Sequence, residues 1–188
     1  MKRVRRDELL DLAAYERSRP EIRAAILEAK GRRRVHVAGV LTFLFENAAT
    51  VRYQVQEMIR AERMTREADI LHELETYNEL LGGKGELGCS LLIEIPDPAE
   101  RDEKLRAWLG LPDRLYVKLE DGTKVRPTFD GRQVGADRLS SVQYLKFDVR
   151  GGTPVAVGCD HPALEGETML DAEQRAALAA DLASDPAS

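Results

Sequence analysis

The sequence predicts an α+β fold: a mainly antiparallel sheet with helices packed on it, including a helical hairpin inserted between two strands. Three observations lead to this prediction. Short runs rich in β-branched and aromatic residues are separated by tight-turn residues, as around Asp121 and Gly122. Several of these runs follow one another in hairpin order. Segments with helical spacing of apolar residues interrupt them in blocks rather than alternating with them.

The first part of the chain predicts two helices and two strands. Residues 7–15 have the pattern of a short amphipathic helix, and Ser18 with Glu21 has the spacing of a capping box before a second helix that ends at Gly31. Residues 35–37 and 40–46 follow as strands. Asn47 is expected to cap a helix to about residue 64, and Thr65 another to residue 81.

The remaining elements are mostly strands. We expect a strand over residues 86–95 and then a helix with Asp97 as its cap. Residues 115–120 and 123–129 form one predicted hairpin, and residues 139–149 and 154–159 a second. A last helix begins at Asp171, with Gln174 at the capping spacing. We expect one domain over residues 1–183 and a frayed tail over residues 184–188.

The composition limits the classes of partner. The 188 residues include 28 Lys and Arg against 33 Asp and Glu, so the net charge of −5 makes nucleic acid an unlikely partner class. Cys89 and Cys159 form no metal-binding pair and suggest reduced thiols. The longest apolar stretch, residues 37–45, is far shorter than the roughly 20 residues that span a bilayer. We therefore expect a cytoplasmic protein without a membrane anchor.

Glu62 is the first candidate for a functional carboxylate. It continues the predicted apolar stripe of its helix, which consists of Val51, Val55, Met58 and Ile59. A carboxylate aimed at a core needs a cation, hydrogen bonds or a metal as partner. Glu57 on the same helix and Glu46 just before it could join Glu62 in a metal site. The alternative is a structural ion pair with the nearby guanidinium groups of Arg60, Arg63 and Arg66.

His161 is the second candidate, because it follows a predicted strand and lies in the sequence Asp160, His161, Pro162. Imidazole is a common transition-metal ligand and transfers protons near neutral pH. A site of carboxylates and one histidine would suit iron, manganese or zinc. The alternative is an ordinary surface histidine. The spacings of a zinc-protease HExxH motif, a dinucleotide-binding GxGxxG loop, a phosphate-binding loop and a GxSxG elbow are absent from the sequence.

Several segments together resemble an uncharacterised bacterial family, domain-of-unknown-function family 3501. The resemblance rests on the run from Phe45 to Arg63, on Tyr77 and Asn78, and on residues 93–98, 141–147 and 160–162. It spans nearly the whole chain. The resemblance implies no reaction, but it implies an accessory role in redox or peroxide metabolism beside a rubrerythrin-like or iron–sulfur oxidoreductase protein.

These observations lead to two main functions, beside binding of RNA or nucleotide through the basic run Arg32 to Arg34. In the first, Glu62 and His161, with Glu57, Glu46 or Cys159, line a metal site of a redox-associated protein. In the second, the protein is a non-catalytic interaction module whose helical hairpin and arginine-rich edge, with Arg60, Arg63 and Arg66, dock on an oxidoreductase. Convergence of the Glu46 to Glu62 segment with the His161 loop would favour the first function, and their separation would favour the second.

Overall fold

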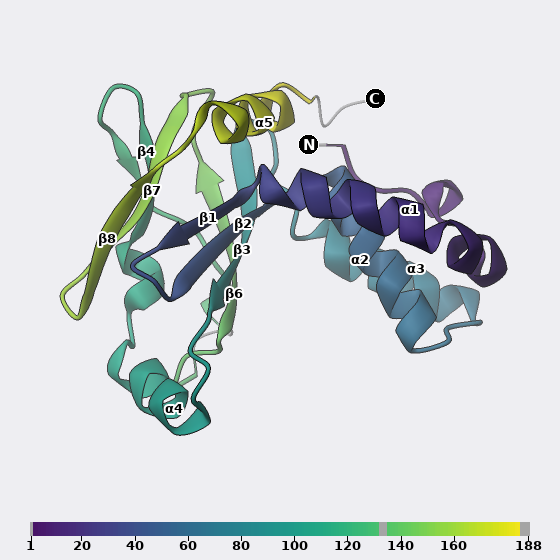
Figure 1. Ribbon diagram of the computed structural model, residues 1–188, viewed down its shortest axis with the longest axis horizontal. Helices are drawn as coiled ribbons and strands as arrows, with labels where there is room; N and C mark the ends of the chain where they lie inside the picture. Colours follow the sequence, from purple (N-terminus) through teal and green to yellow (C-terminus); the bar gives the residue numbers. More distant parts are fainter. Residues whose placement is uncertain (1, 132–134, 185–188) are drawn as a thin grey trace.

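Two antiparallel sheets carry a helical arm on one side and further helices at their ends (Figure 1). The computed structural model describes residues 2–131 and 135–184. In them, sheet A has the order β1 (Arg34–Val37), β2 (Leu41–Glu46), β3 (Glu86–Ile93), β6 (Val142–Asp148). Sheet B has the order β5 (Lys124–Val125), β4 (Leu115–Leu119), β7 (Pro154–His161), β8 (Leu164–Met169). The predicted α+β class with antiparallel strands is confirmed.

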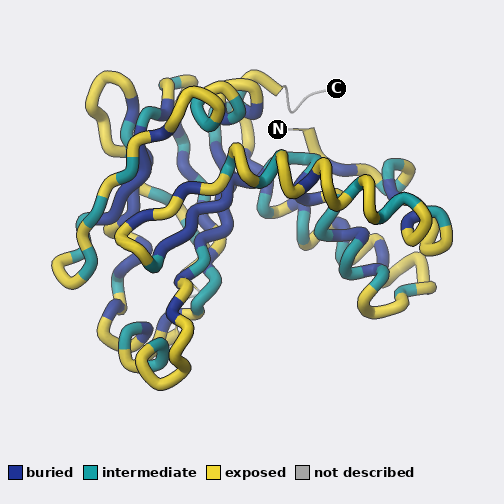
Figure 2. Tube along the Cα trace, viewed as in Figure 1, coloured by how far each residue is buried: buried dark blue, intermediate teal, exposed yellow. Residues whose placement is uncertain are grey.

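The main core lies between the two sheets. Alternate residues of each strand point into it, so Phe43 and Phe45 of β2 join Leu91 of β3 and Val117 of β4 in one buried cluster. Phe45 and Phe147 pack with ring centroids 6.3 Å apart at a tilt of 55°. The other face of each sheet points away from this core. In sheet A, the arm covers part of this outer face (Figure 2).

The helical arm consists of α1 (Leu12–Gly31), α2 (Ala48–Ala61) and α3 (Glu67–Asn78). It extends to one side of the sheets, and α2 and α3 form the helical hairpin that the sequence predicts between two strands (Figure 1). The arm has a second buried cluster, which includes Val51, Val55, Ile59, Ile70 and Leu74. Three of these residues belong to the predicted stripe of α2, and that stripe therefore packs against neighbouring helices.

The beginning of the chain differs from the prediction. A short 3-10 helix, η1 (Arg6–Glu8), precedes α1, and α1 is one helix capped by Asp11 instead of two helices divided at Ser18. Pro20 lies inside it. A proline removes one backbone hydrogen bond, and packing against α2 outweighs that local cost here. The predicted capping box of Ser18 and Glu21 is therefore wrong.

The second predicted hairpin is also wrong. β6 pairs with β3 in sheet A, whereas β7 pairs with β4 and β8 in sheet B, so the Gly151 turn connects two sheets. β7 forms its hairpin with β8, a strand that the sequence did not predict. β5 is confined to two residues of the predicted strand over 123–129. Farther along, Thr128 bridges Lys146 of sheet A, so this stretch leaves sheet B early.

Most helix caps were predicted correctly. Asn47, Asp97 and Asp171 cap α2, α4 (Pro98–Ala107) and α5 (Ala172–Ala183). Arg66, not Thr65, precedes α3. A 3-10 helix, η2 (Leu111–Arg114), leads into β4. The predicted tail begins at Ser184, the C-cap of α5, and its residues 185–188 lie outside the described residues. Among the described helices, none combines the length and the apolar character needed to cross a membrane.

An ion pair and the Asn47 side-chain amide join the arm to α5, which packs on β3 and β7. Arg33, between α1 and β1, donates two hydrogen bonds of 2.7 and 3.0 Å to Asp181 of α5. Asn47, the cap of α2, donates to the same carboxylate at 3.2 Å. The side chains of Arg33 and Asp181 are only 11% and 8% exposed. Solvent therefore screens this pair weakly, and it ties α1, α2 and α5 together at one point.

We expect Asp181→Ala to lower the free energy of unfolding by about 3 kcal/mol, because it leaves the Arg33 guanidinium buried without its counter-ion. Chemical denaturation measures this loss. The matched control is Asp148→Ala, which removes an ion pair with Arg150 whose side chains are 43% and 86% exposed. That control should cost less than about 1 kcal/mol. Equal losses in the two variants would contradict the structural role of the Asp181 pair.

Candidate functional site

Glu46 is buried where the arm meets sheet A. It ends β2, and its carboxylate accepts hydrogen bonds from the Thr50 hydroxyl at 2.5 Å and from the Ser90 hydroxyl at 2.7 Å. Thr50 belongs to the first turn of α2 and Ser90 to β3. Both donors are themselves buried. Glu46 therefore fastens the start of α2 to the sheet, and together with Arg33, Asn47, Thr50, Ser90 and Asp181 it forms what we call the arm junction.

Glu57 is held inside the arm. Its carboxylate accepts two hydrogen bonds from Arg19 of α1, at 2.7 and 2.8 Å, and a third from the Tyr15 hydroxyl at 2.6 Å. These donors favour the ionised form, and the hydrogen bond from Arg19 is the main cause that lowers the pKa of Glu57 from 4.5 to about 2. The carboxylate is therefore a structural anion that joins α1 to α2.

Glu62 is exposed, so the prediction that it continues the buried stripe is wrong. α2 ends at Ala61, Glu62 is its C-cap, and Arg63 adopts a positive φ of 49°. The turn takes residue 62 off the helical face before its side chain can reach the core. Two of the arginines predicted as its ion-pair partners have other partners. Arg60 Nε lies 2.8 Å from Glu16 Oε1, and Arg66 Nε, on a side chain that is 79% exposed, lies 3.9 Å from Asp69 Oδ2.

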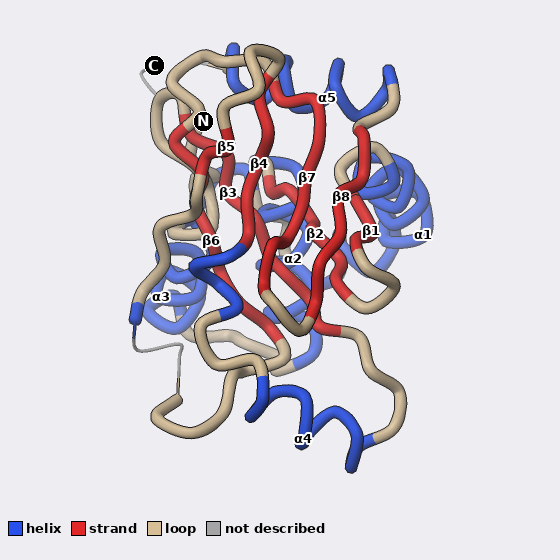
Figure 3. Tube along the Cα trace, turned by 90° about the vertical axis from the view of Figure 1, so that its left-hand side faces the viewer, coloured by secondary structure: helices blue, strands red, loops and turns tan. Residues whose placement is uncertain are grey.

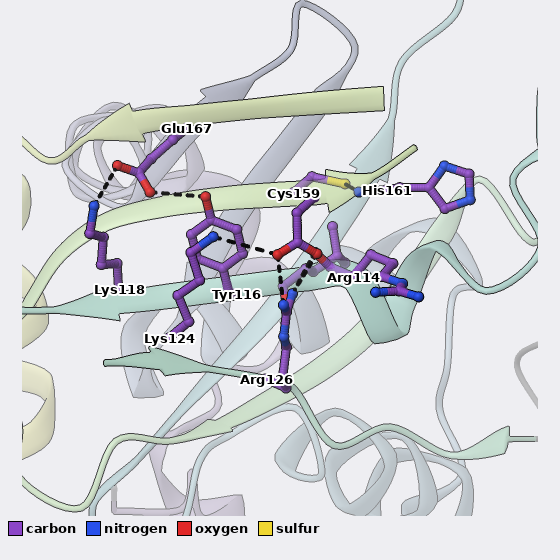
Figure 4. Close-up of polar contacts among 10 residues, drawn as sticks. Arg114, Tyr116, Lys118, Lys124, Arg126, Cys159, His161 and Glu167 are labelled. Atoms are coloured by element: carbon purple, nitrogen blue, oxygen red, sulfur yellow. Dashed lines mark hydrogen bonds and ion pairs between the residues drawn. The ribbon is translucent and has the colours of Figure 1, made fainter. Parts of the chain in front are cut away.

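His161 lies at the far end of sheet B, where β7 turns into β8 (Figure 4). Its Nδ1 accepts a hydrogen bond of 3.2 Å from the backbone of Ala163, and its own backbone N–H donates to the Cys159 sulfur at 3.4 Å. Burial raises the pKa of the Cys159 thiol. The imidazole thus helps to close the turn, and the neighbouring thiol stays protonated.

Tyr116 is the centre of a polar network on the outer face of sheet B, next to this turn (Figure 4). Its ring lies on Gly158, where an added Cβ would come within 2.4 Å of the ring, and Lys124 Nζ lies 4.0 Å from the ring centroid. The hydroxyl donates to Glu167 at 2.9 Å. Burial, with the Glu167 carboxylate as the next cause, raises the pKa of Tyr116 to about 12.

Ion pairs extend this network across the strands. Asp160 accepts two hydrogen bonds from Arg126, at 2.6 and 2.9 Å, while Lys118 Nζ lies 2.9 Å from Glu167. No helix of the described residues covers this face (Figure 3). The network therefore links the side chains of β4, β5, β7 and β8 on a face of sheet B against which no described helix packs.

The predicted metal ligands lie at four separate places. Glu46 is at the arm junction, Glu57 on α2 faces α1, Glu62 is the exposed C-cap of α2, and His161 ends β7 of sheet B. Within residues 2–131 and 135–184, no group of three or more His, Cys, Asp or Glu side chains is placed to hold a metal ion. Metal binding by these residues stays a prediction.

A groove lies between the arm and sheet A. Its volume is about 740 Å³, and it lies between one side of α3 and the adjoining residues of β6. Tyr77 and Leu80 line it from the arm, Tyr144 and Lys146 from β6, and Phe129 from the segment that bridges to β6. Tyr144 is 44% exposed. The groove therefore offers accessible aromatic and aliphatic surface.

A close backbone approach holds the end of the arm against sheet A. The chain after α3 passes over Gly88 of β3, and a Cβ added to Gly88 would meet the Leu80 carbonyl oxygen at 1.8 Å. Only glycine allows this approach. Ser90 and Tyr144 are directly paired across β3 and β6, so they point to the same face of the sheet as the arm.

The groove provides groups for binding rather than an activated nucleophile. Cys89 is the thiol among the lining residues, and it is buried. Burial is the main cause that raises the pKa of the Cys89 thiol well above its usual range, and the Glu46 carboxylate is the next cause. The thiol therefore stays protonated near neutral pH and is a poor nucleophile. Ser90 donates its hydroxyl to Glu46, whose carboxylate is shared with Thr50.

The sequence did not identify the groove, although Tyr77 and residues 141–147 were among the segments that carry the family resemblance. The roles of two other such residues are structural. The Gln56 amide exchanges hydrogen bonds with the backbone of Leu10, and the Asn78 amide does the same with Val4. Each amide pairs with both the N–H and the C=O group of one residue, and the two amides thereby bind the segment before α1 to the arm.

Comparisons with known proteins agree with this description. The model of a family described as "Protein of unknown function (DUF3501)" matches residues 3–182. The crystal structure of a novel protein of unknown function from Burkholderia pseudomallei K96243 is similar, with a TM-score of 0.87 and 31% sequence identity. The alignment covers 95% of this chain and 98% of that one. No curated protein matches the sequence.

Glu57→Gln should make the protein less sensitive to acid. The pKa of Glu57 is lowered by folding, so its contribution to stability is present above pH 4.5 and is lost as the pH falls towards about 2. We expect the wild type to lose about 1 to 2 kcal/mol more than the variant over this interval, allowing for partial solvent screening. Denaturation at a series of pH values measures this. Parallel curves for the two proteins would contradict the assignment.

The separation of the predicted ligands leads to an expectation for metal content. Protein purified from its native host and a Glu62→Gln, His161→Ala double variant should contain the same amount of iron, manganese and zinc, because these two side chains do not share a site. Elemental analysis of both proteins is the measurement. Stoichiometric metal in the wild type together with its absence from the double variant would contradict this expectation and support the predicted metal site.

Proposed function

The chain belongs to the DUF3501 family, and we propose that it is a non-catalytic interaction module that docks on a partner protein through the groove between α3 and β6. The observation that carries this proposal is the groove itself, with its accessible tyrosine and its volume of about 740 Å³. Aromatic side chains in a hollow are the residues that contribute most to binding energy at protein interfaces.

The arrangement of charged groups supports a binding role over a catalytic one. The carboxylates with predicted roles, Glu46 and Glu57, are engaged in hydrogen bonds that hold the arm in place. The predicted metal ligands are distributed over the molecule, and this was the arrangement expected to favour an interaction module. For the partner, we propose the class that the family resemblance implies, a rubrerythrin-like or iron–sulfur oxidoreductase protein.

The docking surface of this proposal differs from the arginine-rich edge that the sequence indicated. Arg60 is occupied by Glu16, whereas Arg63 and Arg66 are exposed at the tip of the arm. Exposed single arginines contribute to association rate more than to affinity. Residues of α3, of β6 and of the segment 128–130 line the groove, and a folded partner could contact them together, so it is the surface that we propose for docking.

Tyr144→Ala should weaken capture of the partner from host extract by about ten-fold, because a tyrosine in a hollow of an interface is worth more than 1 kcal/mol. Quantitative affinity capture from the native host measures this. Tyr53→Ala is the matched control, since Tyr53 is a partly exposed arm residue outside the groove. It should capture as much partner as the wild type.

Equal capture by the Tyr144 and Tyr53 variants would contradict the proposal. Loss of capture in an Arg63→Ala, Arg66→Ala double variant, with normal capture by Tyr144→Ala, would place the docking surface at the tip of the arm instead. Thermal unfolding of each variant checks that the fold is retained.

A further inference from the structure

We infer that the groove binds an extended, positively charged segment of the partner protein, with a Lys or Arg side chain placed against the rings of Tyr77 and Tyr144. The inference rests on the proposed function, because it names the chemistry of the partner that would occupy the docking surface. Three properties of the groove carry it: the sign of its charges, its aromatic lining and its length.

The charges around the groove are mainly negative. Among its described lining residues, Glu73, Glu79 and Asp130 carry carboxylates, and Lys146 carries the one ammonium group. Neither of the two glutamates has an ion pair with a described residue. Glu73 is half-buried on α3, and Glu79, the C-cap of α3, is exposed. A hollow lined by one sign of charge concentrates ligands of the opposite sign. An acidic or neutral segment would gain nothing from these groups.

The aromatic lining is suited to the same class of ligand. Tyr77 and Tyr144 approach the groove from opposite walls, and the negative faces of tyrosine rings attract ammonium and guanidinium groups. Burial raises the pKa of the Tyr77 phenol, a hydrogen bond with Gln54 lowers it, and the Glu73 carboxylate raises it further. Glu73 therefore places a negative charge close to the Tyr77 side chain. Leu80 and Phe129 offer apolar contact for the aliphatic stem of Lys or Arg.

The length of the groove favours a chain segment over a single small cation. The lining residues of α3 and its end run from Glu73 to Leu80, or about 10 Å at 1.5 Å per helical residue. That distance matches about three residues of extended chain at roughly 3.3 Å each. A volume of about 740 Å³ is also larger than one amine would fill. The occupant is therefore a short stretch of basic polypeptide.

Titration of the whole protein with two labelled octapeptides tests the inference. One alternates lysine and alanine, and the other alternates glutamate and alanine. We expect the lysine peptide to bind and the glutamate peptide not to bind, by fluorescence anisotropy at low salt. A Glu73→Gln, Glu79→Gln double variant should lower the affinity for the lysine peptide by about five-fold or more, because it removes two attractive charges without changing side-chain size.

The control is Glu75→Gln, which removes a carboxylate from the exposed side of α3 that does not line the groove. Its affinity should stay within about two-fold of the wild type, and Tyr144→Ala should lose affinity as the double variant does. Equal effects of Glu75→Gln and the double variant would overturn the inference, because attraction would then be a general property of an acidic protein. Binding of the glutamate peptide would also overturn it.

Spermine serves as a free cation in the same assay. Tight spermine binding that depends on Glu73 and Glu79, without binding of the lysine peptide, would replace the partner segment by a small-molecule cation and so overturn the inference. The proposed function has a separate readout. If Tyr144→Ala abolishes partner capture while the Glu73→Gln, Glu79→Gln double variant captures normally, docking through the groove stands and the cationic occupant is wrong.

Discussion

The arm junction is the constraint on which the rest of the structure depends. At this point a buried carboxylate, Glu46, is shared by hydroxyl groups from α2 and β3, and Asp181 is shared by Arg33 and Asn47. Charged groups with little exposure tolerate few alternative geometries, because each displaced donor would leave a charge without compensation. The junction therefore fixes where the arm leaves the sheets, and with it the distance between α3 and β6 across the groove.

Local chemistry explains the parts of the fold that could be predicted. Asn47, Asp97 and Asp171 each present a side-chain oxygen to a free N–H group of a helix start, and such signals depend only on residues within one turn. Pairing of distant strands has no comparable local signal. β6 and β7 look like a hairpin because a glycine turn separates them, yet the register of each is set by β3 and β4. The continuation of α1 through Pro20 likewise depends on packing against α2.

The candidate site shows the same limit. Helical spacing placed Glu62 on a buried stripe, but the helix ends one residue before it, and helix ends are the least predictable feature of a periodic pattern. Gln56, Glu57 and Asn78 are unusual polar residues, and the structure gives them partners within the arm. Tyr77 and Tyr144 come together only through the pairing of β3 with β6 and the position of α3. Sequence spacing could not reveal their proximity.

The proposed function requires that a partner covers the groove. Hydrogen exchange, followed by mass spectrometry on the complex isolated from the native host and on the free protein, tests this most directly. Docking through the groove should slow exchange at the end of α3 and in residues 128–130 and 144–146, with little change on the outer face of sheet B. Protection confined to sheet B or to the tip of the arm would contradict it.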